Sequence, residues 1–588
     1  MKIKSAKLTG FFSVLPSRLF FLFAFLYFYF FGNHVLFFQE KTSLFIFSFE
    51  FLTENIKQPG GFLVYISAFL ATFSCYPAAG ALIYATILWM IVVFSLEITV
   101  AVSGSKRVLI PYLAGLALFY LQLDYRYLLF NNTGILLQIL FFWLSVRYLK
   151  GFIPVLLLPL FYFLTGGFTL IYLFMFSAWL LYTRPEAWKL KMLSFWLIIL
   201  LFFGLSKEFL FFQSADTLLK YPFTEADTGS QIYIFSAAAF MIAFLPLLPA
   251  FRKKKPVRTE IFRLPASLTG SAILFILLSS IAALRYDKKT SQYFRVESLF
   301  YEGRYQDVID YNIRHPSGNI LTLFLNNIAL CETGRLNDML FHFRQSPDGG
   351  TLFQKWDISS EISRRGGYFY YTIGMMNEAR RWAFENMVTR GFTPEGLRLL
   401  IKADIINGDY HTAAKYIRIL KKTLFYRDEA RQFEKLLFDD KAVDMHPELG
   451  ERRRSKARTD FITISGIPLI NIERMLATGS VNRKAFEYKL AWLLLTKDHQ
   501  GILQEWDKLG EYGFEKVPVH MDEAAAAVKV LSAGQFIPQG DFTVSPDTEL
   551  RFERFLQTFR AYGNNPKAAE PALRKQFGNT FWYWNFYH

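Results

Sequence analysis

Five carboxylates are the residues of this sequence whose type and place suit catalysis or metal binding. They lie between apolar segments in the N-terminal half: Glu50, Glu54, Asp124, Glu225 and Asp227. Two carboxylates separated by one residue, as in Glu225-Ala226-Asp227, can bind one divalent cation through their oxygens. The sequence therefore offers a metal site at Glu225 and Asp227, with a solvated polar loop as the alternative.

The other three carboxylates are candidates for a catalytic role. Glu50 and Glu54 stand among phenylalanines, and Asp124 ends an apolar segment. A charge at the end of a membrane segment is costly unless it is paired, so Asp124 needs a partner that the sequence leaves open. Glu97 lies inside an apolar segment. An acidic residue within a membrane helix is costly, so Glu97 is a further functional candidate, unless its side chain simply extends to the nearby interface.

Motifs of the common enzyme classes do not occur in the sequence. The chain has no Ser–His–Asp order, no HExxH, no phosphate-binding loop and no GxGxxG in a suitable context. Its two cysteines, Cys75 and Cys331, form neither a disulfide framework nor a cysteine-based metal site, and we expect both to be packing residues. No cofactor is implied, and whether the protein is an enzyme stays open at this point.

Hydrophobic helices are the elements that must position these carboxylates. The chain has 588 residues, of which 53% are hydrophobic, and its long apolar runs stop at Arg285. A membrane-spanning helix needs about 20 apolar residues. We therefore predict an all-α protein whose residues 1–285 form a polytopic transmembrane bundle of about nine spans. The spans are expected at 19–38, 79–101, 108–123, 133–149, 151–165, 167–183, 191–206, 231–251 and 266–284.

Charge predicts the orientation of this membrane domain. Residues 1–285 carry 23 Lys and Arg against 11 Asp and Glu, so most of the chain's net charge of +16 belongs to them. Basic residues gather on cytoplasmic loops, and 17 of the 23 do so if 39–78 stays on the outer side. This predicts a cytoplasmic N-terminus and a periplasmic or otherwise extracytoplasmic C-terminal half. Insertion thus explains the basic charge, and we expect no nucleic-acid partner.

The stretch 40–77 is predicted to be an interfacial or re-entrant segment. Its first part, Glu40–Asn55, is too charged to span a bilayer and too aromatic to leave its surface. Its second part, 60–76, has only about 15 apolar residues, fewer than a span needs. If 60–76 did span, every later loop would change sides.

After residue 285 the pattern becomes that of packed amphipathic helices. A glycine recurs between two helical stretches, at Gly303, Gly334, Gly374 and Gly408, and the clearest unit is Leu397–Leu420. These residues resemble tetratricopeptide repeats, whose period is about 34 residues. The resemblance implies helical repeats at 286–440. We expect a polar insertion or linker at 441–482 and a C-terminal helical domain at 483–588.

Two segments of the C-terminal half allow two interpretations each. The charged run Glu451–Lys456 is expected to be a solvated loop, with an anion or lipid site as the alternative. The aromatic segment Phe581–Tyr587 is expected to dock on the helical array, with the membrane interface as the alternative.

Two further resemblances concern the whole chain. It is similar to an uncharacterised bacterial family of polytopic membrane proteins at Gln58–Phe62, Tyr76-Pro77, Gly80-Ala81, Asp124-Tyr125, Asn131–Gly134 and Asn579–Tyr583, which implies no known activity. The layout also resembles GT-C membrane glycosyltransferases, which have an essential acid in the first outer loop and an outward C-terminal domain. That resemblance implies Glu50 or Glu54 as the base, although the family usually has Asp there. It also implies a polyprenyl-phosphate sugar donor and admits a divalent cation.

Two functions are consistent with these patterns. In the first, an integral protein of the inner membrane presents its helical repeats to a protein or peptide partner, as a scaffold or in assembly. In the second, a GT-C-like transferase moves a sugar from a polyprenyl-phosphate lipid to an acceptor. A transporter ranks behind both, because few charges lie within the apolar segments and no inverted repeat is visible.

Overall fold

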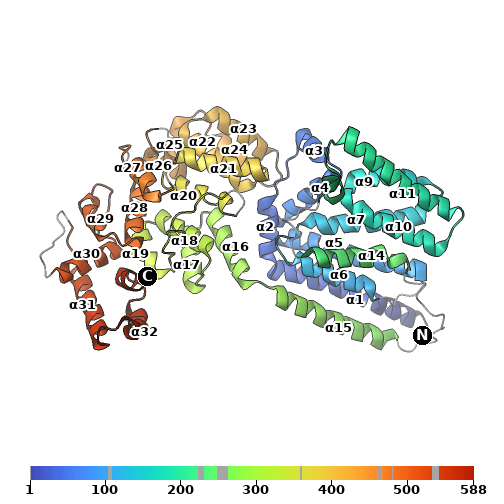
Figure 1. The fold of residues 1–588 in the computed structure, drawn as a ribbon, viewed down its shortest axis with the longest axis horizontal. Helices are drawn as coiled ribbons and strands as arrows, with labels where there is room; N and C mark the ends of the chain where they lie inside the picture. The colour runs from blue at the N-terminus through green and yellow to red at the C-terminus, as the bar shows by residue number, and fades with distance from the viewer. Residues whose placement is uncertain are drawn as a thin grey trace. The chain divides into compact units, whose positions relative to one another are not determined.

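The computed structural model describes residues 2–103, 109–222, 231–247, 263–357, 361–459, 462–463, 466–479, 481–532 and 542–588. Every regular element in these ranges is a helix, and the contacts between helices divide the chain into two units. Unit 1 comprises Met1–Lys288 with Lys422–Phe425, and unit 2 comprises Lys289–Lys421 with Tyr426–His588. The predicted fold class is confirmed, since the described residues contain helices and no strands and several apolar helices lie in the N-terminal half (Figure 1).

Unit 1 is a bundle of apolar helices. In Figure 1 the helices α1, α5, α6 and α15 lie alongside one another, and their contacts join them. Its helices are α1 (Lys2–Phe30), α2 (Asn33–Thr42), α3 (Phe49–Ile56), α4 (Gly61–Thr72), α5 (Pro77–Ser103), α6 (Ile110–Gln122), α7 (Leu129–Tyr148), α8 (Ile153–Leu156), α9 (Leu158–Thr165), α10 (Thr169–Thr183), α11 (Trp188–Leu205), α12 (Ala215–Lys220), α14 (Ile232–Ala243) and α15 (Arg263–Arg285).

Several of these helices indicate a membrane protein. Among the described residues, five are long and apolar enough to cross a bilayer, at Pro77–Ala101, Leu129–Tyr148, Leu158–Thr183, Trp188–Leu210 and Leu268–Arg285. The pair Leu15–Phe30 and Asn33–Thr42 meets the same test together, although it bends by 73°. The number is lower than the nine spans predicted, partly because α6 and α14 have only 13 and 12 residues.

Glycines break two apolar stretches, one within the predicted span 19–38 and one between the predicted spans 151–165 and 167–183. The span expected at 19–38 breaks between α1 and α2, where a Cβ added to Gly32 would lie 2.8 Å from the Phe28 Cα. Gly166 has a φ of +59° and ends α9, so the stretch Leu158–Thr183 contains two helices. Buried breaks of this kind are tolerated at membrane depth only where other protein groups satisfy the backbone.

The stretch 40–77 folds into short helices. Ser48 caps α3 by accepting a hydrogen bond from the Phe51 amide at 3.1 Å. Helix α4 has 12 residues and is therefore about 18 Å long, which is short of a bilayer core of about 30 Å. The Gly60 amide before α4 donates to the Phe163 carbonyl of α9 at 2.9 Å. Helix α4 is thus too short to cross a bilayer core by itself, and the interfacial or re-entrant placement of 40–77 stays a prediction.

Side-chain amides satisfy the backbone where helices end inside unit 1. The Gln39 amide group donates to the carbonyls of Tyr125 and Tyr127 at 3.1 and 3.3 Å, and its oxygen accepts from the Leu129 amide at 3.2 Å. Nearby, Asn132 donates to Gln122 Oε1 at 2.8 Å. These uncharged groups join α2 to the end of α6 and the start of α7. They also satisfy backbone groups that would each cost several kcal/mol if they were left unpaired in an apolar interior.

Unit 2 is an array of packed helices. Those in its first part are α16 (Lys288–Tyr301), α17 (Tyr305–Arg314), α18 (Ile320–Glu332), α19 (Leu336–Met339), α20 (Gly367–Thr372), α21 (Met376–Arg390), α22 (Pro394–Asn407), α23 (Tyr410–Lys421) and α24 (Arg427–Glu434). Those in its second part are α25 (Asp440–Met445), α26 (Pro447–Ser455), α27 (Pro468–Leu476), α28 (Arg483–Leu495), α29 (His499–Gln504), α30 (Val519–Leu531), α31 (Pro546–Ala561), α32 (Pro566–Phe577) and α33 (Phe581–Tyr587).

The four recurring glycines all make turns between helices, as predicted. Gly303, Gly334, Gly374 and Gly408 separate α16 from α17, α18 from α19, α20 from α21 and α22 from α23. Their φ angles are +70°, +69°, +86° and +87°, in the left-handed region that favours glycine. The turn positions read from the sequence are therefore confirmed.

The sequence-based prediction of a polar insertion or linker at 441–482 is corrected by the structure. The segment contains α26 and α27, and the charged run 451–456 is partly helical and packed. Arg452 is buried, pairs with Glu332 and donates to the Thr372 carbonyl at 2.8 Å. Its partners lie 120 and 80 residues away in the sequence, so periodicity and local charge could not reveal them.

The aromatic segment at the C-terminus docks on unit 2. Trp582 and Trp584 are 3% and 5% exposed, and their indole nitrogens donate to the carbonyls of Glu523 and Leu495 at 2.6 and 3.1 Å. Glu523 also accepts from the Phe581 amide at 2.8 Å. The aromatic segment therefore docks on the helical array, as expected.

Candidate functional site

The two predicted catalytic glutamates lie on the exposed side of α3. The side chains of Glu50 and Glu54 are 78% and 67% exposed. Glu54 pairs with Lys57, and Glu50 lies 3.7 Å from Lys422, which belongs to the same unit. The backbone N–H of Glu50 and the Ser48 hydroxyl hold the pKa of the Glu50 carboxyl below its usual value. Such a carboxylate is a weaker base than an ordinary glutamate.

The structure supplies the partner that Asp124 required. Its Oδ2 accepts from Arg285 Nη2 at 3.0 Å and from Gln231 Nε2 at 2.6 Å, while its Oδ1 accepts from the Arg126 amide at 3.0 Å. The Arg285 guanidinium also lies over the Tyr120 ring, 4.6 Å from its centroid. With both oxygens engaged, Asp124 ties the end of α6 to the start of α14 and the end of α15.

The predicted metal pair, Glu225 and Asp227, lies outside the described residues. Within the described ranges, no group of three or more His, Cys, Asp or Glu side chains is arranged to hold a metal ion. The divalent cation that a GT-C-like enzyme would admit therefore stays a prediction.

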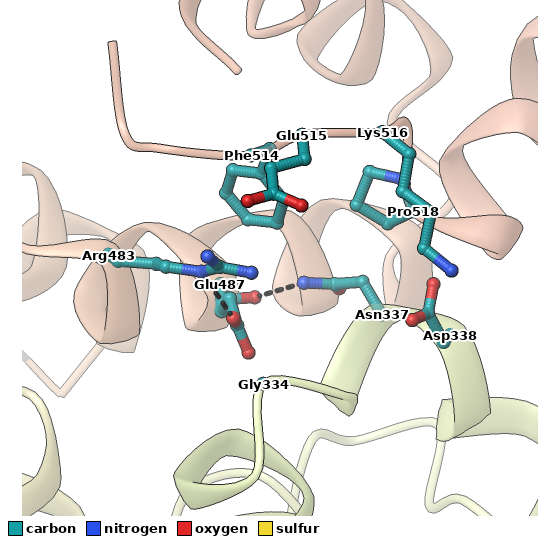
Figure 2. A pocket seen from close by; sticks show the side chains of 9 residues that line it. All are labelled: Gly334, Asn337, Asp338, Arg483, Glu487, Phe514, Glu515, Lys516 and Pro518. Atoms are coloured by element: carbon teal, nitrogen blue, oxygen red, sulfur yellow. Dashed lines mark hydrogen bonds and ion pairs between the residues drawn. The ribbon is translucent and has the colours of Figure 1, made fainter. Parts of the chain in front are cut away.

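A cavity in unit 2 gathers charged side chains that the sequence did not single out. Its volume is about 450 Å³, and Figure 2 shows the three segments that supply its lining. They are the turn at α19, the first turns of α28 and the loop before α30, with the lining residues Gly334, Asn337, Asp338, Arg483, Glu487, Phe514, Glu515, Lys516 and Pro518.

Local structure explains how these segments present their side chains. Asn482 caps α28 by accepting from the Ala485 amide at 2.9 Å, which sets Arg483 and Glu487 one turn apart on the same face. The loop before α30 is fixed by the Val519 amide, which donates to Asp338 Oδ1 at 2.8 Å. Asp338 thus lies where α19 meets the start of α30.

Glu487 is the central group of the cavity. It is 2% exposed, and its Oε1 accepts from Arg483 Nε at 3.2 Å. Its Oε2 is buried and has no hydrogen-bond partner among the described residues. Burial, partly opposed by the charge of Arg483, raises the pKa of the Glu487 carboxyl from 4.5 to about 7. This carboxyl therefore changes charge near neutral pH.

Asn337 adds a second unsatisfied acceptor. Its Nδ2 donates to the Glu487 carbonyl at 2.9 Å, as the dashed line in Figure 2 shows. Its Oδ1 is buried and, among the described residues, accepts no hydrogen bond. Two buried acceptors without donors at one cavity are unusual, because about 90% or more of such groups are satisfied in folded proteins.

The remaining charged groups occupy the outer part of the cavity. Glu515 and Lys516 are exposed, whereas Arg483 is held by the Gly513 carbonyl at 2.9 Å and lies 4.5 Å from the Phe514 ring centroid. The cavity therefore offers hydrogen-bond acceptors in its buried part and both signs of charge at its rim. Such an arrangement suits binding of a polar ligand, and it includes no nucleophile paired with a base.

Sequence reasoning missed this site for a physical reason. Asn337 and Glu487 are 150 residues apart, and Asp338 and Val519 are 181 apart. One local signal was the Arg483–Glu487 spacing on a helix, which is common on solvated surfaces. The apolar neighbours of Glu487, Phe486 and Tyr488, were a second local signal, but the sequence alone does not show that Glu487 is buried.

Comparison with known proteins adds a family but no activity. No curated protein and no solved structure matches the chain. One family profile matches residues 8–588, nearly the whole sequence, and its description is a family of unknown function, DUF6057. This agrees with the resemblance to an uncharacterised family seen at Gln58–Phe62 and the other positions named above. The chain belongs to DUF6057, a family of unknown function.

Proposed function

We propose that this protein is an integral membrane protein that binds a peptide or protein partner in unit 2, with the cavity at Glu487 as the recognition site. The observation that carries the proposal is the pair of buried acceptors, Glu487 Oε2 and Asn337 Oδ1, at the cavity of about 450 Å³. A buried acceptor without a donor costs about 1–3 kcal/mol, so a donor group from a partner relieves an existing penalty.

The arrangement of unit 2 supports a binding role. Arrays of helix pairs joined by short turns present extended surfaces to peptides, and the four glycine turns from Gly303 to Gly408 are of this kind. In this proposal unit 2 is tetratricopeptide-like and acts as a scaffold or assembly module. Unit 1 then anchors it in the inner membrane, with the N-terminus cytoplasmic and unit 2 in the periplasm.

Photo-crosslinking in the intact membrane tests the proposal. A photoreactive amino acid replaces Lys516 at the cavity in the full-length chain, and in a matched control it replaces Lys575, which is exposed on α32 and does not line the cavity. We expect a discrete adduct to one peptide or protein from position 516 only. We also expect the yield to fall severalfold when Asn337→Ala is added, because that substitution removes one of the two buried acceptors.

Three results would contradict this function. They are no adduct from position 516, equal adducts from positions 516 and 575, and an adduct whose yield Asn337→Ala leaves unchanged. Circular dichroism of each purified variant verifies that the fold is kept, so that a lost adduct reports on binding.

The GT-C-like transferase remains a separate hypothesis. It requires Glu50 or Glu54 beside a donor-binding cavity, and neither residue lines the cavity described in unit 2. Its test is the glycan profile of the cell envelope in Glu50→Gln and Glu54→Gln strains, which should change if either carboxylate acts as the base.

A further inference from the structure

The charges around the cavity specify which kind of group it can accept. Three carboxyls and two cationic side chains line it: Asp338, Glu487, Glu515, Arg483 and Lys516. When all are ionised they leave one negative charge in excess, so one positive group would neutralise the cavity. The negative charge deepest in the cavity belongs to Glu487, which is 2% exposed.

The hydrogen-bonding capacity of the cavity points in the same direction. The two buried atoms at the cavity that have no hydrogen-bond partner within the described part of the chain, Glu487 Oε2 and Asn337 Oδ1, are acceptors and therefore require donors. The guanidinium of Arg483 is already engaged by Glu487 and the Gly513 carbonyl and is stacked on Phe514, so it is a poor free receptor for an anion. A compact cation with several donors satisfies the site better than a carboxylate or phosphate would.

We propose that the cavity binds a primary ammonium group of the partner, either its amino terminus or a lysine side chain, between Glu487 and Asn337. An ammonium has three donors and one positive charge, which match the unsatisfied acceptors and the excess negative charge. This inference rests on the proposed function of unit 2, because it identifies the group that a partner would place in the cavity.

Binding of an ammonium should depend on pH in a defined direction. Burial and, to a smaller extent, the charge of Asp338 raise the pKa of Glu487 to about 7, against the opposing charges of Arg483 and Lys484. The neutral Cys331 thiol and Tyr488 phenol lie nearby, and burial raises the pKa of both. From pH 6 to pH 8 the ionised fraction of Glu487 therefore rises about tenfold, and ammonium affinity should rise by a similar factor.

Ligand-observed saturation-transfer NMR on the full-length protein in lipid nanodiscs tests this inference. The probes are Nα-acetyl-L-lysine amide, which presents a side-chain ammonium, and glycinamide, which presents an α-ammonium. The neutral control is Nα,Nε-diacetyl-L-lysine amide, which has nearly the same shape without the charge. We expect saturation transfer to at least one ammonium probe and a loss of about tenfold or more in affinity for the neutral control.

Two variants with the same change in charge locate the binding group. Glu487→Gln removes the buried carboxylate, and Glu515→Gln removes an exposed carboxylate from the same cavity. We expect Glu487→Gln to weaken ammonium binding about tenfold or more at pH 8 and to abolish its pH dependence. Glu515→Gln should weaken it less than about threefold, because exposed charge pairs contribute little.

The outcomes separate this inference from the proposed function. Equal binding of the charged and neutral lysine probes, or equal effects of the two variants, would overturn the ammonium site. The comparison of probes needs no variant, so it holds even where Glu487→Gln disturbs folding. A partner crosslinked at position 516 together with no ammonium binding would leave the binding function in place and remove only this inference.

Discussion

Buried carboxylates in unit 2 differ in the cationic side chains that pair with them. Glu297 and Glu332 each meet a buried arginine, with Arg365 Nη2 lying 2.6 Å from Glu297 and Arg452 beside Glu332. Arg452 and Lys484 hold the pKa of Glu332 below its usual value against the effect of burial. Glu487 differs, since the arginine that pairs with it among the described residues, Arg483, is itself 45% exposed. Two cations at Glu332 thus outweigh burial, whereas the single exposed arginine at Glu487 does not.

The raised pKa of Glu487 predicts a pH-dependent stability. The unfolded chain loses this proton near pH 4.5, but the folded chain keeps it until about pH 7. Within this window the folded state binds more protons, so its stability falls as the pH rises, by about 3 kcal/mol in total. Glu487→Gln should therefore raise the midpoint of thermal unfolding at pH 8 and change it little at pH 4.5.

A second buried acid provides the control for this measurement. Burial raises the pKa of Asp404 from 3.8 to about 6, although Arg380 Nε lies 2.6 Å from its Oδ1. Asp404→Asn should therefore act within a lower window, between pH 4 and 6. A Glu487→Gln difference from the native protein that is the same at pH 5 and pH 8 would show that Glu487 is ionised throughout.

At the scale of elements, turns could be predicted and long-range pairing could not. A glycine between two amphipathic stretches marks a helix–turn–helix locally, and Gly374 and Gly408 both adopt the expected left-handed φ. The helix of 447–455 was missed, because the charges of Arg452 are satisfied by Glu332 and Thr372 rather than by water. The cavity was missed for the same reason, since Asn337 meets Glu487 only in the folded unit.

Substitution of two turn glycines should have different effects. Gly374 and Gly408 have similar φ angles, so alanine strains the backbone by about 1–2 kcal/mol at both positions. A Cβ on Gly374 would also lie 2.8 Å from Asn482 Nδ2 and from the Ser455 carbonyl oxygen, whereas Gly408 faces open space. Gly374→Ala should thus lower the unfolding midpoint clearly more than Gly408→Ala in thermal denaturation. Equal effects would mean that the turn at Gly374 is not packed as described.

Loss of the docked aromatic helix should destabilise unit 2. Trp584 is buried, stacks on Phe341 at 5.5 Å between ring centroids, and donates to the Leu495 carbonyl. Trp584→Ala should cost about 3–5 kcal/mol, the usual range for a buried tryptophan. Phe586→Ala, at a side chain that is 45% exposed, should cost much less and serves as the matched control. Limited proteolysis of the two variants in membranes would show the difference, and equal protection would contradict docking.

At the scale of the whole molecule, the boundary between unit 1 and unit 2 along the sequence lies close to the end of α15. The main segment of unit 1 ends at Lys288, a few residues after α15, which ends at Arg285. An alkaline-phosphatase fusion joined after Arg285 should be active if this point lies in the periplasm, because that enzyme requires disulfides formed outside the cytoplasm. A fusion joined after Lys150, on a predicted cytoplasmic loop, should be inactive. An inactive fusion after Arg285 together with an active fusion after Lys150 would show the opposite orientation.

The pairing of α18 and α19 with much later helices has a consequence for how unit 2 forms. In a linear solenoid each repeat contacts its neighbours, so unfolding can proceed one repeat at a time. Here Lys484 binds Glu332 at 2.7 Å across 152 residues, and the Val519 amide binds Asp338 across 181. Closing such loops is entropically costly and slows folding. Unit 2 should therefore melt in one cooperative transition, and its early helices should stay open to proteases during synthesis until residues near 520 have emerged.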